Sequence, residues 1–273
     1  MSTTRNYGLI LDVPDPTHYV FGSTGNLPMD VLQPDVDWRP FLPVKEYQNL
    51  NNVEPFACVS FTVLNAIEIL IRRKYDLERN FSDRFLAAVS GTKAGGNSPQ
   101  KVCETLRHGG IAMQEAWPFD QRITTFEKFY EEVPEAVVEL AKEFLSEFTF
   151  KHDFVEPTHD GISFALKCSP LLVSVAAWHR GADGMYYRPP GATDNHATTL
   201  VYQQPNVYRQ VFDSYADGEG DPSLKDVRWK DLPTVVKRFW IEKNTAKVEK
   251  KAGERRLCRF LSLLLTRTAP PTS

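Results

Sequence analysis

The sequence lacks the features that mark several classes of protein. No apolar stretch reaches the roughly 18–20 residues that a membrane-spanning helix needs, and residues 1–26 show no basic segment followed by an apolar one, as a secretory signal would. The formal net charge of the 273 residues is −3, so no overall positive field attracts nucleic acid or an anionic membrane. We therefore expect a cytoplasmic, monomeric protein that binds neither nucleic acid nor a membrane.

Cysteine is also scarce, and its spacing excludes the common metal sites. The four cysteines contain no CxxC pair and no metal-ligand spacing; they are Cys58, Cys103, Cys168 and Cys258. Because no secretory signal is present, we expect reduced thiols rather than disulfides. The sequence indicates no metal and no cofactor.

What is present is the composition of a globular protein, with 42% hydrophobic and 25% charged residues. Helix signals dominate the first half, where capping residues, helical spacing of apolar residues and terminating glycines recur. The expected helices run from near Ala57 to Arg72-Arg73-Lys74, from Ser82 to Gly91, from Ser98-Pro99 to Gly109-Gly110, and from Pro134 through Phe148.

The second half changes character. Short segments rich in β-branched and aromatic residues alternate with turn clusters, which is typical of strands. The expected strands are Leu171–Trp178, Ala197–Tyr202, Val207–Phe212 and Arg238–Glu242. Helices followed by strands favour an α+β fold with two lobes over a parallel α/β sheet.

The expected domain organisation has three parts. Residues 1–36 are predicted to be an extended N-terminal arm, and residues 37–242 one domain with a helical lobe over about 55–150 and a β lobe over about 160–242. Residues 243–273 form a basic tail, with seven Lys or Arg between Lys243 and Arg259 and then the mostly apolar Phe260–Leu265. A membrane-surface or partner helix is one interpretation of this tail. We favour a frayed tail or a helix packed on the body, because the apolar run is short.

Cys58 is the cysteine best placed for chemistry. A free thiol has a pKa of about 8.5 and becomes a nucleophile at neutral pH only when a helix N-terminus or an imidazolium favours the thiolate. Cys58 stands at the expected start of a helix. Among the six histidines, His196 alone opens a strand-like run behind a short polar segment. From these two residues alone, a cysteine that merely packs in the core remains an alternative.

Several further motifs occur in a fixed order along the chain. They are Val36-Asp37-Trp38-Arg39 with Pro43-Val44-Lys45, Gln48, Cys58-Val-Ser-Phe61, Asn80-Phe81-Ser82-Asp83, Gly95-Gly96 to Gly110-Ile111 and Trp117-Pro118-Phe119, Ser169-Pro170 to Val175, and Asn195-His196-Ala197. In this order the chain resembles the papain-like cysteine peptidases over about residues 36–242. The separation of Cys58 and His196 agrees with the spacing known for that family.

The resemblance implies a fold and a set of roles. It implies a papain-like two-lobed α+β fold, with a helical first lobe and an antiparallel β-sheet or barrel as the second. It implies Cys58 as nucleophile, His196 as acid and base, Asp213 as the group that orients the imidazole, and Gln48 as an oxyanion donor. Gly95 and Gly96 would bind the substrate backbone, and Asn195 would line the pocket wall. For Gly95-Gly96 a simple turn, and for Asp213 a turn cap, are the alternatives.

The sequence also departs from the pattern of the family. Pro55-Phe56-Ala57-Cys58-Val59 lacks the usual disulfide cysteine and the tryptophan after the nucleophile, and Gln48 lies further upstream than usual. Asp213 stands where the family has an asparagine, and the following Trp-Gly pair is missing. The residues before the motif region are too few for a long inhibitory prosegment, so we expect restraint by substrate access. The prediction is a cysteine peptidase that acts on peptides or proteins through a thioester. An inactive peptide-binding protein and an acyl transferase are the alternatives.

Overall fold

The computed structural model describes residues 6–13, 15, 18, 20–21, 30–215 and 223–244, and the structural statements below concern these residues. The basic tail predicted from the sequence lies almost wholly outside them, as does Cys258. The three cysteines that are described are free thiols: Cys58, Cys103 and Cys168. Within this part of the chain, no helix has the length and hydrophobicity that a bilayer crossing requires.

The expected helices of the first half are confirmed, and their ends follow the capping signals. Ser82 and Ser98 cap their helices by accepting hydrogen bonds from the backbone N–H groups of Phe85 and Lys101. Asp76 closes the first helix in a left-handed conformation. The helices are α1 Cys58–Tyr75, α2 Asp83–Val89, α3 Pro99–Gly109, α4 Phe126–Phe129, α5 Glu135–Glu147 and α6 His159–Cys168, with 3₁₀ turns at η1 Arg39–Phe41 and η2 Leu50–Asn52.

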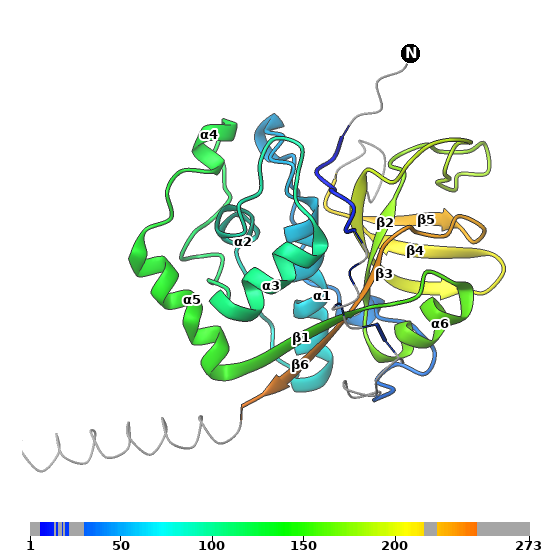
Figure 1. The fold of residues 1–273 in the computed structure, drawn as a ribbon, viewed down its shortest axis with the longest axis horizontal. Coiled ribbons are helices and arrows are strands. Elements are labelled where there is room, and N and C mark those ends of the chain that lie inside the picture. The colour runs from blue at the N-terminus through cyan, green and yellow to red at the C-terminus, as the bar shows by residue number, and fades with distance from the viewer. Residues whose placement is uncertain are drawn as a thin grey trace, which may run out of the picture.

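The strands form one antiparallel six-stranded sheet in the order β1-β6-β2-β3-β4-β5. They are β1 Phe148–Phe154, β2 Leu171–Val175, β3 His196–Gln204, β4 Tyr208–Phe212, β5 Leu224–Arg228 and β6 Val236–Lys243. The structure thus has the expected α+β class. Figure 1 shows α2–α5 gathered on one side and β2–β5 on the other, with α1 between them.

Several elements differ from the sequence-based expectation. The fourth helix was expected to include Phe148, but it ends at Glu147 and Phe148 begins β1, where it pairs with Lys243. The helices α4 and α6 and the strands β1 and β5 were not expected at all. The helix α4 is a single turn and β5 is short and largely polar, so periodicity alone is a weak signal for these two, and pairing with β4 decides that residues 224–228 are extended.

The register of the sheet places the two candidate residues of the second half near each other. Thr199 pairs with Phe212, so Thr198 stands opposite Asp213, at the end of the adjoining strand. His196 lies two residues before Thr198 and therefore on the same face, diagonal to Asp213. Helix α1 packs against β3, and Thr199 Oγ1 donates to the Thr62 carbonyl oxygen at 3.2 Å. This packing carries the start of α1 toward the start of β3.

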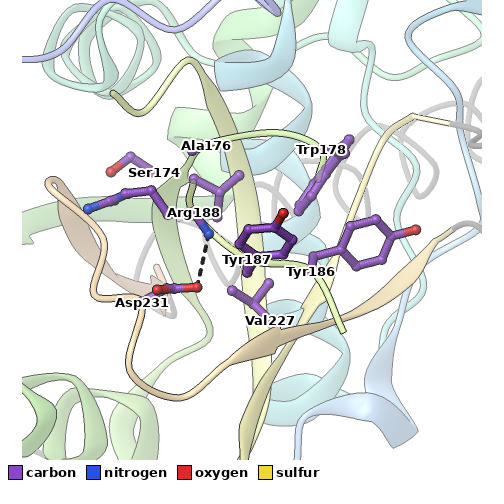
Figure 2. A pocket seen from close by; sticks show the side chains of 9 residues that line it. Ser174, Ala176, Trp178, Tyr186, Tyr187, Arg188, Val227 and Asp231 are labelled. Atoms are coloured by element: carbon purple, nitrogen blue, oxygen red, sulfur yellow. Dashed lines mark hydrogen bonds between the residues drawn. The ribbon is translucent and has the colours of Figure 1, made fainter. Parts of the chain in front are cut away.

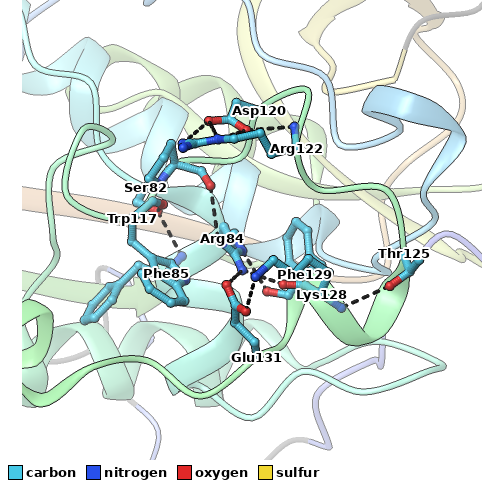
Figure 3. Close-up of polar contacts among 11 residues, drawn as sticks. Ser82, Arg84, Phe85, Trp117, Asp120, Arg122, Thr125, Lys128, Phe129 and Glu131 are labelled. Atoms are coloured by element: carbon cyan, nitrogen blue, oxygen red, sulfur yellow. Dashed lines mark hydrogen bonds and ion pairs between the residues drawn. The ribbon is translucent and has the colours of Figure 1, made fainter.

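A second, smaller apolar cluster supports the beginning of α1. It joins the segment after α3 to Ala57 and Phe61 through the rings of Phe119 and Phe129, whose centroids are 4.8 Å apart. The buried guanidinium of Arg84 holds this segment by donating to the carbonyl oxygens of Phe129, Pro118 and Lys128 (Figure 3). The loop that ends before α5 is therefore fixed to α2 and to the start of α1.

Candidate active site

Cys58 is the first residue of α1, and its side chain is completely buried. At this position the unpaired N–H groups of the first helical turn favour a negative charge. Burial nevertheless raises the pKa of the Cys58 thiol; hydrogen bonds from the backbone of Ala197 and Val59 oppose this, and the charges of Asp213 and Glu54 add to it. In the described conformation Cys58 is therefore a neutral thiol that lies against the residue following His196.

His196 and Asp213 are joined by a hydrogen bond in the interior. His196 Nε2 lies 2.6 Å from Asp213 Oδ1, and both side chains are fully buried. Burial alone would raise the pKa of Asp213, but the charge and the hydrogen bond of His196 and of Lys225 outweigh it, and the pKa is lowered. Asp213 is therefore an anion. The other ring nitrogen, His196 Nδ1, is buried and has no hydrogen-bond partner among the described residues.

Asp213 is shared between two basic groups. Its second oxygen, Oδ2, accepts a hydrogen bond from Lys225 Nζ at 2.8 Å, and the same ammonium donates to the Tyr215 carbonyl oxygen at 3.0 Å. The Lys225 side chain is only 1% exposed. Lys225 belongs to β5, which pairs with β4, so the pairing of these two strands places the lysine beside the carboxylate.

Gln48 is buried, and its amide is held at both ends. Its Oε1 accepts a hydrogen bond from the Ser214 hydroxyl at 3.0 Å, and its backbone N–H donates to the Ser214 carbonyl oxygen at 2.9 Å. Its Nε2 donates to the Tyr7 carbonyl oxygen at 3.4 Å and lies 3.5 Å from Glu54 Oε1. Glu54 in turn accepts hydrogen bonds from the Tyr215 hydroxyl. The amide N–H₂ group of Gln48 therefore already faces a peptide carbonyl.

That carbonyl belongs to the N-terminal segment, by which we mean residues 6–10. The Tyr7 ring contacts the rings of His196 and Tyr215, with centroids 5.3 Å and 5.0 Å away. The Tyr7 backbone N–H donates to the Asn195 carbonyl oxygen at 3.2 Å. Figure 1 shows this part of the chain, in dark blue, running between the helices and the sheet. The backbone of Asn195, rather than its side chain, thus faces the N-terminal segment, because its side-chain Oδ1 accepts from the Ala177 N–H at 2.8 Å.

Gly95 and Gly96 lie on the other side of the same segment. Both have positive φ, +103° and +104°, and Gly96 closes a turn with Lys93. A Cβ on Gly96 would come within 1.9 Å of the Gly8 carbonyl oxygen. Because only glycine leaves this space, the pair both makes a turn and admits a neighbouring backbone.

A small pocket lies beside Trp178 (Figure 2). The Trp178 ring contacts the His196 ring with centroids 5.6 Å apart and forms one wall, with Tyr186 and Tyr187 nearby. Its volume of about 20 Å³ holds roughly one water molecule. Among the described residues, no group of three or more His, Cys, Asp or Glu side chains could hold a metal ion.

The structure therefore brings Cys58, His196, Asp213 and Gln48 into one buried site. It adds three residues to which the sequence motifs assign no role: Lys225, Glu54 and Tyr7. Lys225 lies in a strand that the sequence did not reveal, and Tyr7 precedes the region of family resemblance. Only Glu54 offered a signal, as an acidic residue next to the segment before Cys58.

The fold is that of papain-like cysteine proteases. Over most of its length the chain is structurally similar to such enzymes, at low sequence identity. Xylellain, a cysteine protease from Xylella fastidiosa, is 16% identical and matches 86% of this chain and 95% of its own, with a TM-score of 0.61. Digestive procathepsin L 3 of Tenebrio molitor is 15% identical over 78% of this chain and 71% of its own, with a TM-score of 0.56.

A third similar structure is bromelain from Ananas comosus in complex with the inhibitor E64. It is 18% identical over 76% of this chain and 98% of its own, with a TM-score of 0.54. The sequence matches no family model, and no curated protein matches it. At these identities the likeness establishes the fold, and the chemistry has to be argued from the site.

Proposed function

We propose that the protein is a cysteine peptidase that hydrolyses peptide bonds through a thioester intermediate. The observation that carries this proposal is the buried hydrogen bond from His196 Nε2 to Asp213, beside a cysteine at a helix N-terminus. Asp213 fixes the ring and its tautomer, so Nδ1 is the nitrogen available to exchange a proton with the thiol. The substrate class, peptides or proteins, is the one that papain-like proteases bind.

The reaction follows from these atoms. His196 takes the thiol proton, and the Cys58 sulfur attacks the substrate carbonyl carbon. The Gln48 amide and the Cys58 backbone N–H donate to the oxyanion, and one such donor is typically worth about 3–4 kcal/mol. His196 then gives its proton to the leaving amine, which leaves a thioester. Water adds to the thioester with His196 as base, and the acid product departs with regeneration of the thiol.

The test uses a fluorogenic peptide and a thiol-reactive epoxide. Cys58→Ala should abolish both hydrolysis and labelling, because no other group supplies the nucleophile. Cys168→Ala, which removes another buried free thiol, is the matched control and should keep both. Labelling that persists on another cysteine in the Cys58→Ala protein would reject the assignment.

A second candidate is peptide binding without hydrolysis. It is favoured by the buried, neutral Cys58 and by the backbone of residues 6–10 that pairs within the site. The pH dependence of Cys58 alkylation separates the two functions. A thiolate paired with His196 reacts well below pH 8, and a His196→Ala variant should lose that reactivity, whereas an isolated thiol reacts only as the pH rises toward its own pKa.

A further inference from the structure

Asp213 has a charged partner besides His196. The Lys225 ammonium and Asp213 Oδ2 are 2.8 Å apart, and both side chains are buried. Burying an isolated charge costs several kcal/mol, and pairing offsets that cost. The Asp213–Lys225 pair therefore carries almost no net charge, while Oδ1 still accepts the hydrogen bond of the imidazole.

We propose that Lys225 is a positioning residue that cancels the charge of Asp213, so that the carboxylate orients the His196 ring as a neutral acceptor would. The proposal rests on the proposed peptidase function. Without the lysine, a buried carboxylate would hold the proton on His196 too strongly for transfer to the leaving amine. The same charge raises the pKa of Cys58 and so disfavours the thiolate. Lys225 weakens both effects and leaves the hydrogen bond intact.

The titratable groups around His196 come from several elements. Besides Asp213 and Lys225 they are Cys58 of α1, Glu54 before α1, Tyr7 of the N-terminal segment, and Tyr215. Besides His196 itself, only Lys225 among the described residues contributes a positive charge in contact with Asp213. Removing this one charge therefore changes the balance in a defined direction.

The experiment compares Lys225→Met, Asp213→Asn and the double variant by the pH profiles of kcat/KM and of Cys58 alkylation by iodoacetamide. Lys225→Met should move the basic limb of kcat/KM and the rising limb of alkylation upward by about one pH unit, because the uncompensated carboxylate retains the imidazole proton and disfavours the thiolate. Asp213→Asn should move both limbs downward, because Lys225 is left unpaired. The double variant should return both limbs close to their wild-type positions.

A merely structural lysine would give a different result. Lys225→Met would then lower both rates without moving the limb, and the double variant would be no better than either single one; that pattern overturns the proposal. The alkylation profile does not depend on turnover. If wild type alkylates with these shifts but never hydrolyses peptide, the peptidase assignment fails and the role of Lys225 stands.

Discussion

Replacing Arg84 by methionine should destabilise the protein strongly. The Arg84 side chain is 3% exposed, and its guanidinium donates to three backbone carbonyl oxygens: Phe129 at 2.9 Å, Pro118 at 3.2 Å, and Lys128 (Figure 3). It also lies over the Trp117 ring at 4.4 Å. Methionine keeps much of the volume and removes every donor. It also removes an ion pair with Glu131 Oε1 at 2.8 Å, but the Glu131 side chain is 35% exposed and the pair contributes little.

The magnitude follows from the number of carbonyl groups left behind. A hydrogen bond from a charged donor contributes about 1.5–3 kcal/mol, and a buried acceptor left unpaired costs about 1–3 kcal/mol. Because water can reach part of the loop, we take the lower end for each of the three and expect a loss of about 4 kcal/mol in the free energy of unfolding. For a chain of this size that corresponds to a fall in Tm of roughly 10 °C.

Urea unfolding followed by tryptophan fluorescence measures the change. Arg122→Met is the matched control, because Arg122 also pairs with a carboxylate, Asp120 at 2.6 Å, but is 77% exposed. Its free energy of unfolding should be indistinguishable from that of wild type, since exposed pairs contribute little. A free energy of unfolding for Arg84→Met within about 1 kcal/mol of wild type would show that the carbonyl oxygens do not depend on the guanidinium.

Three further predictions concern stability. Burial raises the pKa of Glu68 well above its usual value, so the stability that Glu68 contributes is lost as the pH rises. Glu68→Gln keeps an acceptor for the Phe81 N–H, which lies 2.7 Å from Glu68 Oε1. In urea titrations this variant should be more stable than wild type by at least about 1 kcal/mol at pH 8, and by less at pH 5. Burial, and then the charge of Lys237, lowers the pKa of His152 to about 3, so the stability that neutral His152 contributes is present above pH 6.5 and lost below it. Between pH 6.5 and pH 5 the free energy of unfolding of wild type should fall by about 2 kcal/mol more than that of His152→Gln. Equal dependence of the two proteins on pH would contradict this. Trp38→Phe should lower the free energy of unfolding by about 2 kcal/mol in calorimetry, because Trp38 is fully buried and its Nε1 donates to the Leu166 carbonyl oxygen at 2.7 Å. An unchanged Tm would show that neighbouring side chains fill the cavity that the smaller ring leaves.

The helices of the first half could be predicted because their signals are local. Ser82 and Ser98 cap helices by bonds within a single turn, and Pro99 begins a helix for the same local reason. The start of α1 has no side-chain cap, and its signals are Pro55 and the helical spacing of the apolar residues that follow Cys58. The strand β5 could not be predicted, because its residues become extended only by pairing with β4.

The candidate site divides in the same way. The sequence alone singled out Cys58 and His196, and the order of motifs around them added Gln48 and Asp213, because each residue sits next to a recognisable local pattern. The tertiary structure alone decided that Lys225 neutralises Asp213 and that Tyr7 lies against His196. The charge balance at Asp213 and the access to the site depend on groups that are far apart in the chain. They are therefore determined only when the sheet and the N-terminal segment pack together.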